Sequence, residues 1–298
     1  MQMLKHKAND QQKKTYRLLG LTLLLMFILA IPAYFWMQSS TRRAKQFQKS
    51  RMSPIIMVPG SSATKERFNT LVKLLNQDTK NKHSLLKLEV KNSGKITYSG
   101  KIARGDREPI IVVGFENNHD GYNNIKKQAK MFDNAFEELS EEYKFNNFKA
   151  FGHSNGGLIW TYWLEHYYTD YKDHITIKKL MTVGSPYNFN ETSINNKTQM
   201  FSDFVKNRDD IPKDLDVISV IGTESYDSDG LVPEASVEAG KYIYQKQVKH
   251  FTTMTVTGED AQHSDLPQNR QIVNLIEQYI MDRPNGKRNN RQKQLQNQ

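Results

Sequence analysis

The sequence predicts an α/β domain, a mainly parallel β-sheet flanked by helices on both faces, preceded by an N-terminal transmembrane helix. Three observations support this prediction. Short apolar runs of β-type residues alternate with amphipathic helical stretches through most of the 298 residues. A G-x-S-x-G pentapeptide lies between one such run and one such stretch. A single uncharged apolar segment occurs near the N-terminus.

The apolar segment, Leu18–Met37, has 20 residues without a charge. A helix of this length spans about 30 Å, the thickness of a bilayer's hydrocarbon core. A cleaved signal peptide would have a shorter apolar region that ends at small residues, whereas this one closes with Tyr34, Phe35 and Trp36. A buried helix of a soluble domain is the other alternative, and the uniform apolarity of this segment on every face argues against it. We therefore expect an uncleaved anchor between a basic leader, 1–17, and a short basic stalk, 38–53.

The charge of +10 is concentrated at the ends of the chain. Residues 1–51 carry ten Lys and Arg against one acid, residues 282–298 carry five against one, and the rest carries 27 against 30. The predicted domain, 54–282, thus has no positive excess for a nucleic-acid backbone, and we expect no nucleic-acid partner. Residues 283–298 are expected to form a disordered basic tail. The absence of cysteine excludes disulfides, thiolate metal sites and a cysteine nucleophile.

Within the domain, six apolar runs of strand length are expected to form the sheet: Pro54–Val58, Pro109–Phe115, Phe148–Phe151, Lys179–Val183, Val217–Gly222 and Thr252–Thr257. Four amphipathic stretches are expected to be helices: Lys65–Asn76, Tyr122–Tyr143, Asn155–Tyr168 and Asn269–Met281. Residues 84–103 alternate like an inserted hairpin with a turn at Asn92–Gly94, and 187–213 are polar and irregular, like a short lid.

The pentapeptide, Gly152-His153-Ser154-Asn155-Gly156, lies where a strand is predicted to turn into a helix. Such a turn holds a serine in a strained backbone conformation, and the two glycines leave room for it. Ser154 is therefore the candidate nucleophile. The alternative is a glycine-rich strand-to-helix connection in which the serine is incidental.

An activated serine needs a histidine base, and four histidines follow Ser154. His166 and His174 lie on or just after the next helix, and His250 precedes a strand at the wrong end of the sheet. His263 follows the last strand, at the edge where catalytic groups gather in parallel sheets. It is the candidate base, with a solvated loop histidine as the alternative.

The orienting acid should follow the preceding strand, where two aspartates lie in Asp227-Ser228-Asp229-Gly230. We favour Asp229, because Gly230 gives it a turn before Leu231-Val232-Pro233, and Asp227 is the alternative. The same four residues resemble part of a calcium loop, but the later ligands of such a loop are missing. No metal site is therefore expected.

The oxyanion hole needs two backbone N–H groups. One is expected from Asn155, directly after the nucleophile. The other is expected from the loop after the first strand, where Gly60 allows a close approach, with Ser61 the favoured donor and Ser62 the next.

Taken together, these motifs resemble the α/β-hydrolase superfamily, and in particular the membrane-anchored cell-surface α/β hydrolases of uncharacterised function from Gram-positive bacteria. The motifs that carry the resemblance, which covers about residues 54–281, are Val58–Ser62, Gly152–Gly157, Ser228–Pro233 and His263–Leu266. It implies Ser154 as nucleophile, Asp229 as acid, His263 as base and an extracytoplasmic domain. The sequence departs from the family pattern in two ways. Pro59 stands where a histidine often opens the oxyanion motif, and no strands are expected before Pro54, so the sheet is expected to begin at its usual third strand.

We therefore expect a serine hydrolase that cleaves a carboxylic ester or related acyl bond of a small molecule or lipid, without metal or organic cofactor. Two other functions use the same residues or the same fold: a membrane-surface acyltransferase and a non-catalytic binding protein. Five basic residues flank each side of the apolar segment, so charge alone does not orient it. We expect the N-terminus inside, because a short leader is easily retained.

Overall fold

The computed structural model describes residues 2–77, 82–225 and 227–282. The chain divides into two units, Met1–Lys49 and Ser50–Gln298. The tail predicted at 283–298 lies outside the described residues.

The first unit is one long helix, α1 (Gln2–Lys49). Its segment Lys14–Gln38 has a mean hydropathy of 2.4 and is long and apolar enough to cross a membrane, which fits a membrane anchor or a signal sequence. The helix continues through most of the predicted stalk. The stalk sequence explains this, because Arg, Ala, Lys and Gln, which favour helix, make up most of 42–49.

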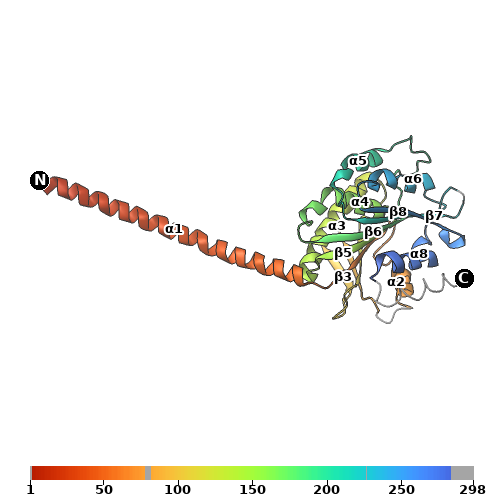
Figure 1. Ribbon diagram of the computed structural model, residues 1–298, viewed down its shortest axis with the longest axis horizontal. Helices are drawn as coiled ribbons and strands as arrows, with labels where there is room; N and C mark the ends of the chain where they lie inside the picture. The colour runs from red at the N-terminus through yellow and green to blue at the C-terminus, as the bar shows by residue number, and fades with distance from the viewer. Residues whose placement is uncertain (1, 78–81, 226, 283–298) are drawn as a thin grey trace. The chain divides into compact units, whose positions relative to one another are not determined.

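The second unit contains an eight-stranded sheet in the order β3-β2-β4-β1-β5-β6-β7-β8 (Figure 1). The strands are β1 (Ile55–Val58), β2 (Leu85–Val90), β3 (Ile96–Gly100), β4 (Ile110–Phe115), β5 (Asn147–His153), β6 (Thr176–Val183), β7 (Asp216–Thr223) and β8 (His250–Thr257). Every neighbouring pair is parallel except β2 with β3. The mainly parallel α/β fold predicted from the sequence is confirmed. The carboxyl ends of its parallel strands lie along one edge of the sheet, the carboxyl edge, which includes Val58, His153, Val183, Thr223 and Thr257.

The hairpin predicted at 84–103 belongs to the sheet itself. β2 pairs along its whole length with β4, in parallel, and β3 forms the antiparallel edge. β1 lies inside the sheet, between β4 and β5. The two outer positions beyond β4 are therefore filled by a hairpin that follows β1 in the chain, so no strands before Pro54 are needed.

The helices of this unit are α2 (Asn69–Leu75), α3 (Tyr122–Tyr143), α4 (Asn155–His166), α5 (Gln199–Asn207), α6 (Glu234–Glu238), α7 (Gly240–Tyr244) and α8 (Arg270–Leu275). Three predicted helices are shorter than expected, and one of them, α4, ends at His166 instead of Tyr168. The stretch 65–68 forms turns closed by Arg67 N–H on the Thr64 carbonyl and Asn69 N–H on the Glu66 carbonyl. The last helix passes into a π-helical segment, η5 (Ile276–Ile280). The lid predicted at 187–213 contains α5, whose N-cap is Thr198.

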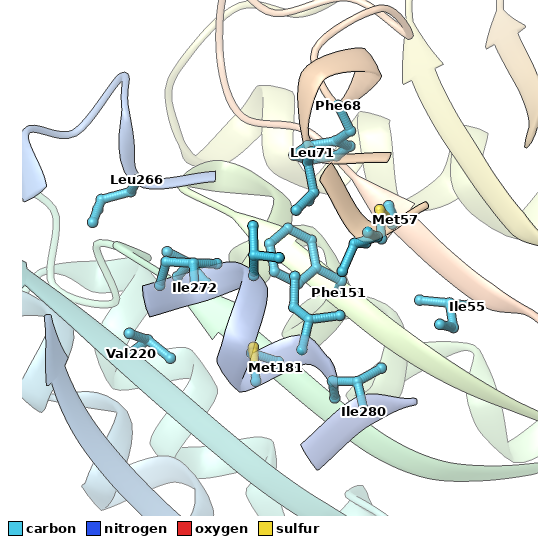
Figure 2. Close-up of a cluster of buried hydrophobic side chains, with 14 of the residues drawn as sticks. Ile55, Met57, Phe68, Leu71, Phe151, Met181, Val220, Leu266, Ile272 and Ile280 are labelled. Carbon is cyan, nitrogen blue, oxygen red and sulfur yellow. The ribbon is translucent and has the colours of Figure 1, made fainter. Parts of the chain in front are cut away.

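The two faces of the sheet carry different helices: α2 and α8 cover one, and α3 and α4 cover the other (Figure 1). The first face packs through a continuous apolar cluster (Figure 2). Phe68 and Leu71 reach it from the α2 segment, Ile272 from α8, and Phe151 from the sheet, with the Phe68 and Phe151 rings 5.4 Å apart. On the opposite face the packing is aromatic, with Phe132 of α3 4.5 Å from Trp160 of α4 and Phe148 of β5 5.8 Å from the same indole, between ring centroids. These two layers hold β5 and α4, and hence the turn between them, in place.

Candidate active site

Ser154 lies at the turn from β5 into α4 with φ 55° and ψ −127°. A non-glycine residue rarely adopts this region, and the strain is sustained by the packed elements on both sides. Ser154 N–H donates to the Val183 carbonyl at 2.9 Å, which ties the turn to β6. A Cβ on Gly152 would lie 2.6 Å from the Gly157 nitrogen, and one on Gly156 would overlap the Val58 carbonyl. The backbone expected of a nucleophile at the end of a strand is therefore present.

His263 and Asp229 form a buried pair beyond the ends of β8 and β7. His263 Nδ1 lies 2.6 Å from Asp229 Oδ2, and the two side chains are 8% and 1% exposed. Because a carboxylate only accepts hydrogen bonds, Nδ1 is the nitrogen that carries the proton in the neutral ring, and the lone pair is then on Nε2. Asp229 is held in turn by the N–H groups of Leu231 and Val232, which donate to Oδ1 at 3.1 and 2.7 Å. This arrangement selects the histidine tautomer that can accept a proton at Nε2.

The pair lies beside the serine turn. His153, directly before Ser154, has its ring centroid 4.8 Å from that of His263. A Cβ on Gly184, at the end of β6, would lie 3.3 Å from His263 Cε1 and 3.1 Å from Asp229 Oδ2. The structure therefore brings the candidate base and acid to the carboxyl edge of the sheet, against the residue that precedes the nucleophile.

The loop after β1 lies against Ser154. A Cβ on Gly60 would lie 2.6 Å from Ser154 Cβ, so only glycine permits this approach. Ser62 N–H donates to the Asn118 carbonyl at 2.8 Å, which removes it as an oxyanion donor. Within the described part of the chain, Ser61 N–H has no hydrogen-bond partner. Of the two donors considered for this loop, Ser61 is the one left available.

Asn155 begins α4, and the first N–H groups of a helix have no partner within it. Its side chain is buried and donates from Nδ2 to Asp120 Oδ1 at 2.8 Å. Asp120 Oδ1 also accepts from Gly121 N–H at 2.7 Å. This bond ties the start of α4 to the loop before α3 and holds the Asn155 backbone in position.

The other candidates lie elsewhere. Asp227 is exposed, and its carbonyl accepts from Glu234 N–H. His166 is exposed and stacks on Tyr162 at 3.9 Å between ring centroids, and His174 is also exposed. His250 starts β8 at the opposite edge of the sheet. Among the described residues, no three His, Asp or Glu side chains are grouped so that they could hold a metal ion.

Sequence reasoning missed two side chains at this site. His153 Nε2 lies 3.0 Å from the His263 carbonyl oxygen, and the Arg67 guanidinium contacts the Ser264 carbonyl oxygen. Burial, with the nearby His263 and Arg67, lowers the pKa of His153 well below its usual value. His153 could have been noticed as a histidine inside the pentapeptide. Nothing in the local sequence distinguishes Arg67 from an ordinary surface arginine.

Comparison with known proteins supports the fold. Residues 42–283 match the family described as "alpha/beta hydrolase of unknown function (DUF915)". A crystal structure of a "putative cell surface hydrolase" from Lactobacillus plantarum WCFS1 is 53% identical, with 83% of this chain and 98% of that one covered and a TM-score of 0.73. A gene product of Listeria innocua is 28% identical, with 79% and 96% covered and a TM-score of 0.72. No match was found among curated proteins.

The family match spans most of the chain, including all eight strands of the sheet and the four motifs that carry the resemblance. The resemblance drawn from those motifs is therefore confirmed. This chain belongs to the DUF915 family of α/β hydrolases.

Proposed function

We propose that the protein is a serine hydrolase that cleaves a carboxylic ester or related acyl bond through an acyl-serine intermediate. The observation that carries this proposal is the buried Asp229–His263 pair, 2.6 Å apart, beside the strained Ser154 turn. Membership of an α/β hydrolase family supports hydrolysis in general. The residue roles are our assignment.

In the proposed reaction, His263 Nε2 takes the proton of Ser154 Oγ as that oxygen attacks the acyl carbon. The same nitrogen then returns the proton to the leaving oxygen, and the bond from this oxygen to the acyl carbon breaks. In the second half, water attacks the acyl carbon as His263 Nε2 takes one of its protons. The bond from Ser154 Oγ to the acyl carbon then breaks, the proton passes from Nε2 to Oγ, and the acid is released. Asp229 keeps Nδ1 protonated and stabilises the positive charge on the imidazole ring.

Each attack places a negative charge on the acyl oxygen. We assign its two donors to the backbone N–H groups of Ser61 and Asn155. The close approach of Gly60 to Ser154 and the engagement of the Ser62 N–H with Asn118 support this choice.

We further propose that α1 anchors the domain to the membrane as a single span with the N-terminus inside and residues 38–298 outside. The exposed apolar segment Lys14–Gln38 supports the span, and a domain of this length can be exported whatever its charge. The substrate is then an acyl ester, of a small molecule or a lipid, that is reachable outside the membrane.

A fluorophosphonate probe tests the nucleophile directly, because it bonds to an activated serine. Full-length protein in detergent should be labelled, and Ser154→Ala should be neither labelled nor active on short acyl esters. Ser185→Ala is a matched control, since Ser185 is also buried near this turn but its hydroxyl is assigned no role. Full labelling of Ser154→Ala would refute the assignment. Product analysis with added alcohol would separate an acyltransferase from a hydrolase.

Protease treatment tests the topology. Protease added to intact cells or protoplasts should degrade or release the domain, with a cytoplasmic protein as the protected control. A domain that is cleaved only after the membrane is broken would refute the outside location while leaving the chemistry of Ser154 untouched.

A further inference from the structure

The backbone around His263 is held at three successive points. His263 N–H donates to the Asp229 carbonyl at 2.8 Å. The His263 carbonyl lies 3.0 Å from His153 Nε2. The next carbonyl, of Ser264, accepts from the Arg67 guanidinium, which also donates to Gln268 Oε1 at 3.2 Å. The peptide groups on both sides of the candidate base are thereby fixed.

The protonation of His153 follows from its partner. A carbonyl oxygen only accepts, so His153 Nε2 carries the proton and donates. His153 is 4% exposed, and its Nδ1 has no hydrogen-bond partner among the described residues. Burial lowers the pKa of His153, so its ring stays neutral and Nε2 keeps its proton. A neutral His153 does not place a second positive charge beside His263.

His153 also has a special place in the chain. It is the last residue of β5 and is bonded directly to Ser154. This hydrogen bond, between residues 110 positions apart, therefore joins the serine turn to the histidine loop. Proton transfer between a serine and a histidine tolerates little error in their separation, and a displacement of about 1 Å can cost about 100-fold in rate.

We propose that His153 is a positioning residue, which sets the distance between Ser154 and His263 by holding the His263 carbonyl, and that Arg67 supports it at the Ser264 carbonyl. This inference rests on the proposed function. His153 does not act on the substrate itself: its donor nitrogen is occupied by the protein backbone.

Two substitutions of similar size separate the hydrogen bond from the bulk of the ring. His153→Leu removes the donor, whereas His153→Gln can place an amide N–H near the position of Nε2. In full-length protein, we expect His153→Leu to lower kcat on a short acyl ester by about 10- to 100-fold with KM within about twofold. His153→Gln should recover kcat to within about threefold of the wild type.

A spectroscopic readout makes the test independent of turnover. The proton between His263 Nδ1 and Asp229 Oδ2 should give a downfield proton NMR signal in the detergent-solubilised protein, absent in His263→Ala. We expect His153→Leu to shift or broaden this signal, and His153→Gln and Ser154→Ala to preserve it. If Ser154→Ala were still labelled by the fluorophosphonate, the proposed function would fail, whereas the signal would still show whether His153 holds His263 in place.

A His153→Leu variant with wild-type kcat and an unchanged signal would overturn the proposal, as would a His153→Gln variant that is as impaired as His153→Leu. If His153→Leu does not fold, Arg67→Met replaces it, because Arg67 is partly exposed. Arg67→Met should lower kcat by about 3- to 10-fold with KM unchanged and should broaden the same signal. An unchanged kcat and an unchanged signal in this variant would overturn the proposal.

Discussion

The same two strands carry a histidine–aspartate pair at each end, and the two pairs have the same separation. His263 and Asp229 follow β8 and β7, whereas His250 and Asp216 begin them. Each pair has Nδ1 2.6 Å from a carboxylate oxygen. The side chains at the carboxyl edge are 8% and 1% exposed, and those at the amino edge are 66% and 37% exposed.

The difference in exposure between the two pairs shows that a short distance from histidine to carboxylate is not enough to make a catalytic site. Water screens the exposed pair, competes for its hydrogen bond and leaves its two side chains free to move. The buried pair is held by backbone N–H groups on Asp229 and by His153 on the His263 carbonyl, and it lies beside the Ser154 turn. Burial and fixed neighbours give the buried pair its single tautomer and orientation.

The two pairs should differ most when their histidines are removed in turn. His263→Ala removes the proposed base, and because the proposed groups act as a unit, we expect turnover of a good ester substrate to fall by a factor on the order of 10⁶. His250→Ala should leave turnover within about twofold. Steady-state rates of the two variants, checked for equal folding by circular dichroism, measure this difference; similar losses in both would contradict the site assignment.

The aspartates should differ by a smaller factor. Asp229→Asn keeps the shape but removes the acceptor that selects the His263 tautomer, and we expect kcat to fall by about 10⁴-fold. Asp216→Asn and Asp227→Asn should stay within about twofold, and both serve as controls. A larger loss in Asp227→Asn than in Asp229→Asn would transfer the acid's role to Asp227.

The Gly60 loop tests how much the surroundings of the buried pair matter. In Gly60→Ala the new Cβ would lie 2.6 Å from Ser154 Cβ, which forces the loop or the serine to shift. We expect kcat to fall by about 10- to 100-fold and fluorophosphonate labelling to slow. Gly94→Ala, at the hairpin turn in open space, should lower stability by about 1 kcal/mol without an effect on kcat. Wild-type turnover in Gly60→Ala would show that this loop does not shape the site.

Glu165 is a buried carboxyl group that, unlike Asp229, accepts no hydrogen bond from the described residues. Both of its oxygens are buried without a hydrogen-bond partner among the described residues, and burial, with Asp210 and Asp203 nearby, raises its pKa to about 10. At pH values between the usual pKa of a glutamate and about 10, Glu165 holds a proton in the folded state but not in the unfolded state. This group therefore makes the fold less stable as the pH rises. Glu165→Gln removes this loss of stability at high pH, because glutamine does not ionise.

Urea unfolding at pH 5, 7 and 9 measures this effect. The free energy of unfolding of Glu165→Gln relative to the wild type should increase steadily with pH. A difference that does not change with pH would show that Glu165 is ionised in the folded protein throughout this range.

The smallest effect is expected at the exposed pair. His250→Gln should change the free energy of unfolding by about 0.5 kcal/mol or less, and added salt should reduce the change further. Thermal unfolding at low and high salt checks this. A change of several kcal/mol would mean that the amino-edge pair is as important to the fold as the buried one is to the site.

The order of strands and helices, and the chemistry at the strand ends, could be predicted from the sequence because they depend on local patterns. Tyr122–Tyr143 forms the predicted helix with the same bounds, since its apolar residues repeat at helical spacing. Ser154, Asp229 and His263 were placed at one edge because the ends of parallel strands meet there. The prediction for 65–76 was wrong at its first turn, where tertiary contacts such as that of Arg67 outweigh a weak local preference for helix.

By itself, the sequence determined the α/β fold class, the apolar N-terminal helix and the candidate nucleophile, base and acid, because periodicity, composition and motif spacing are local properties. Only the tertiary structure decided that the aspartate contacting His263 is Asp229, that the Ser62 N–H is engaged by Asn118, that the 84–103 hairpin extends the sheet beside β4, and that His153 holds the His263 carbonyl. Each of these contacts joins residues far apart in the chain. Such contacts depend on which buried polar groups must find a partner once the layers have packed, and no short stretch of sequence contains that information.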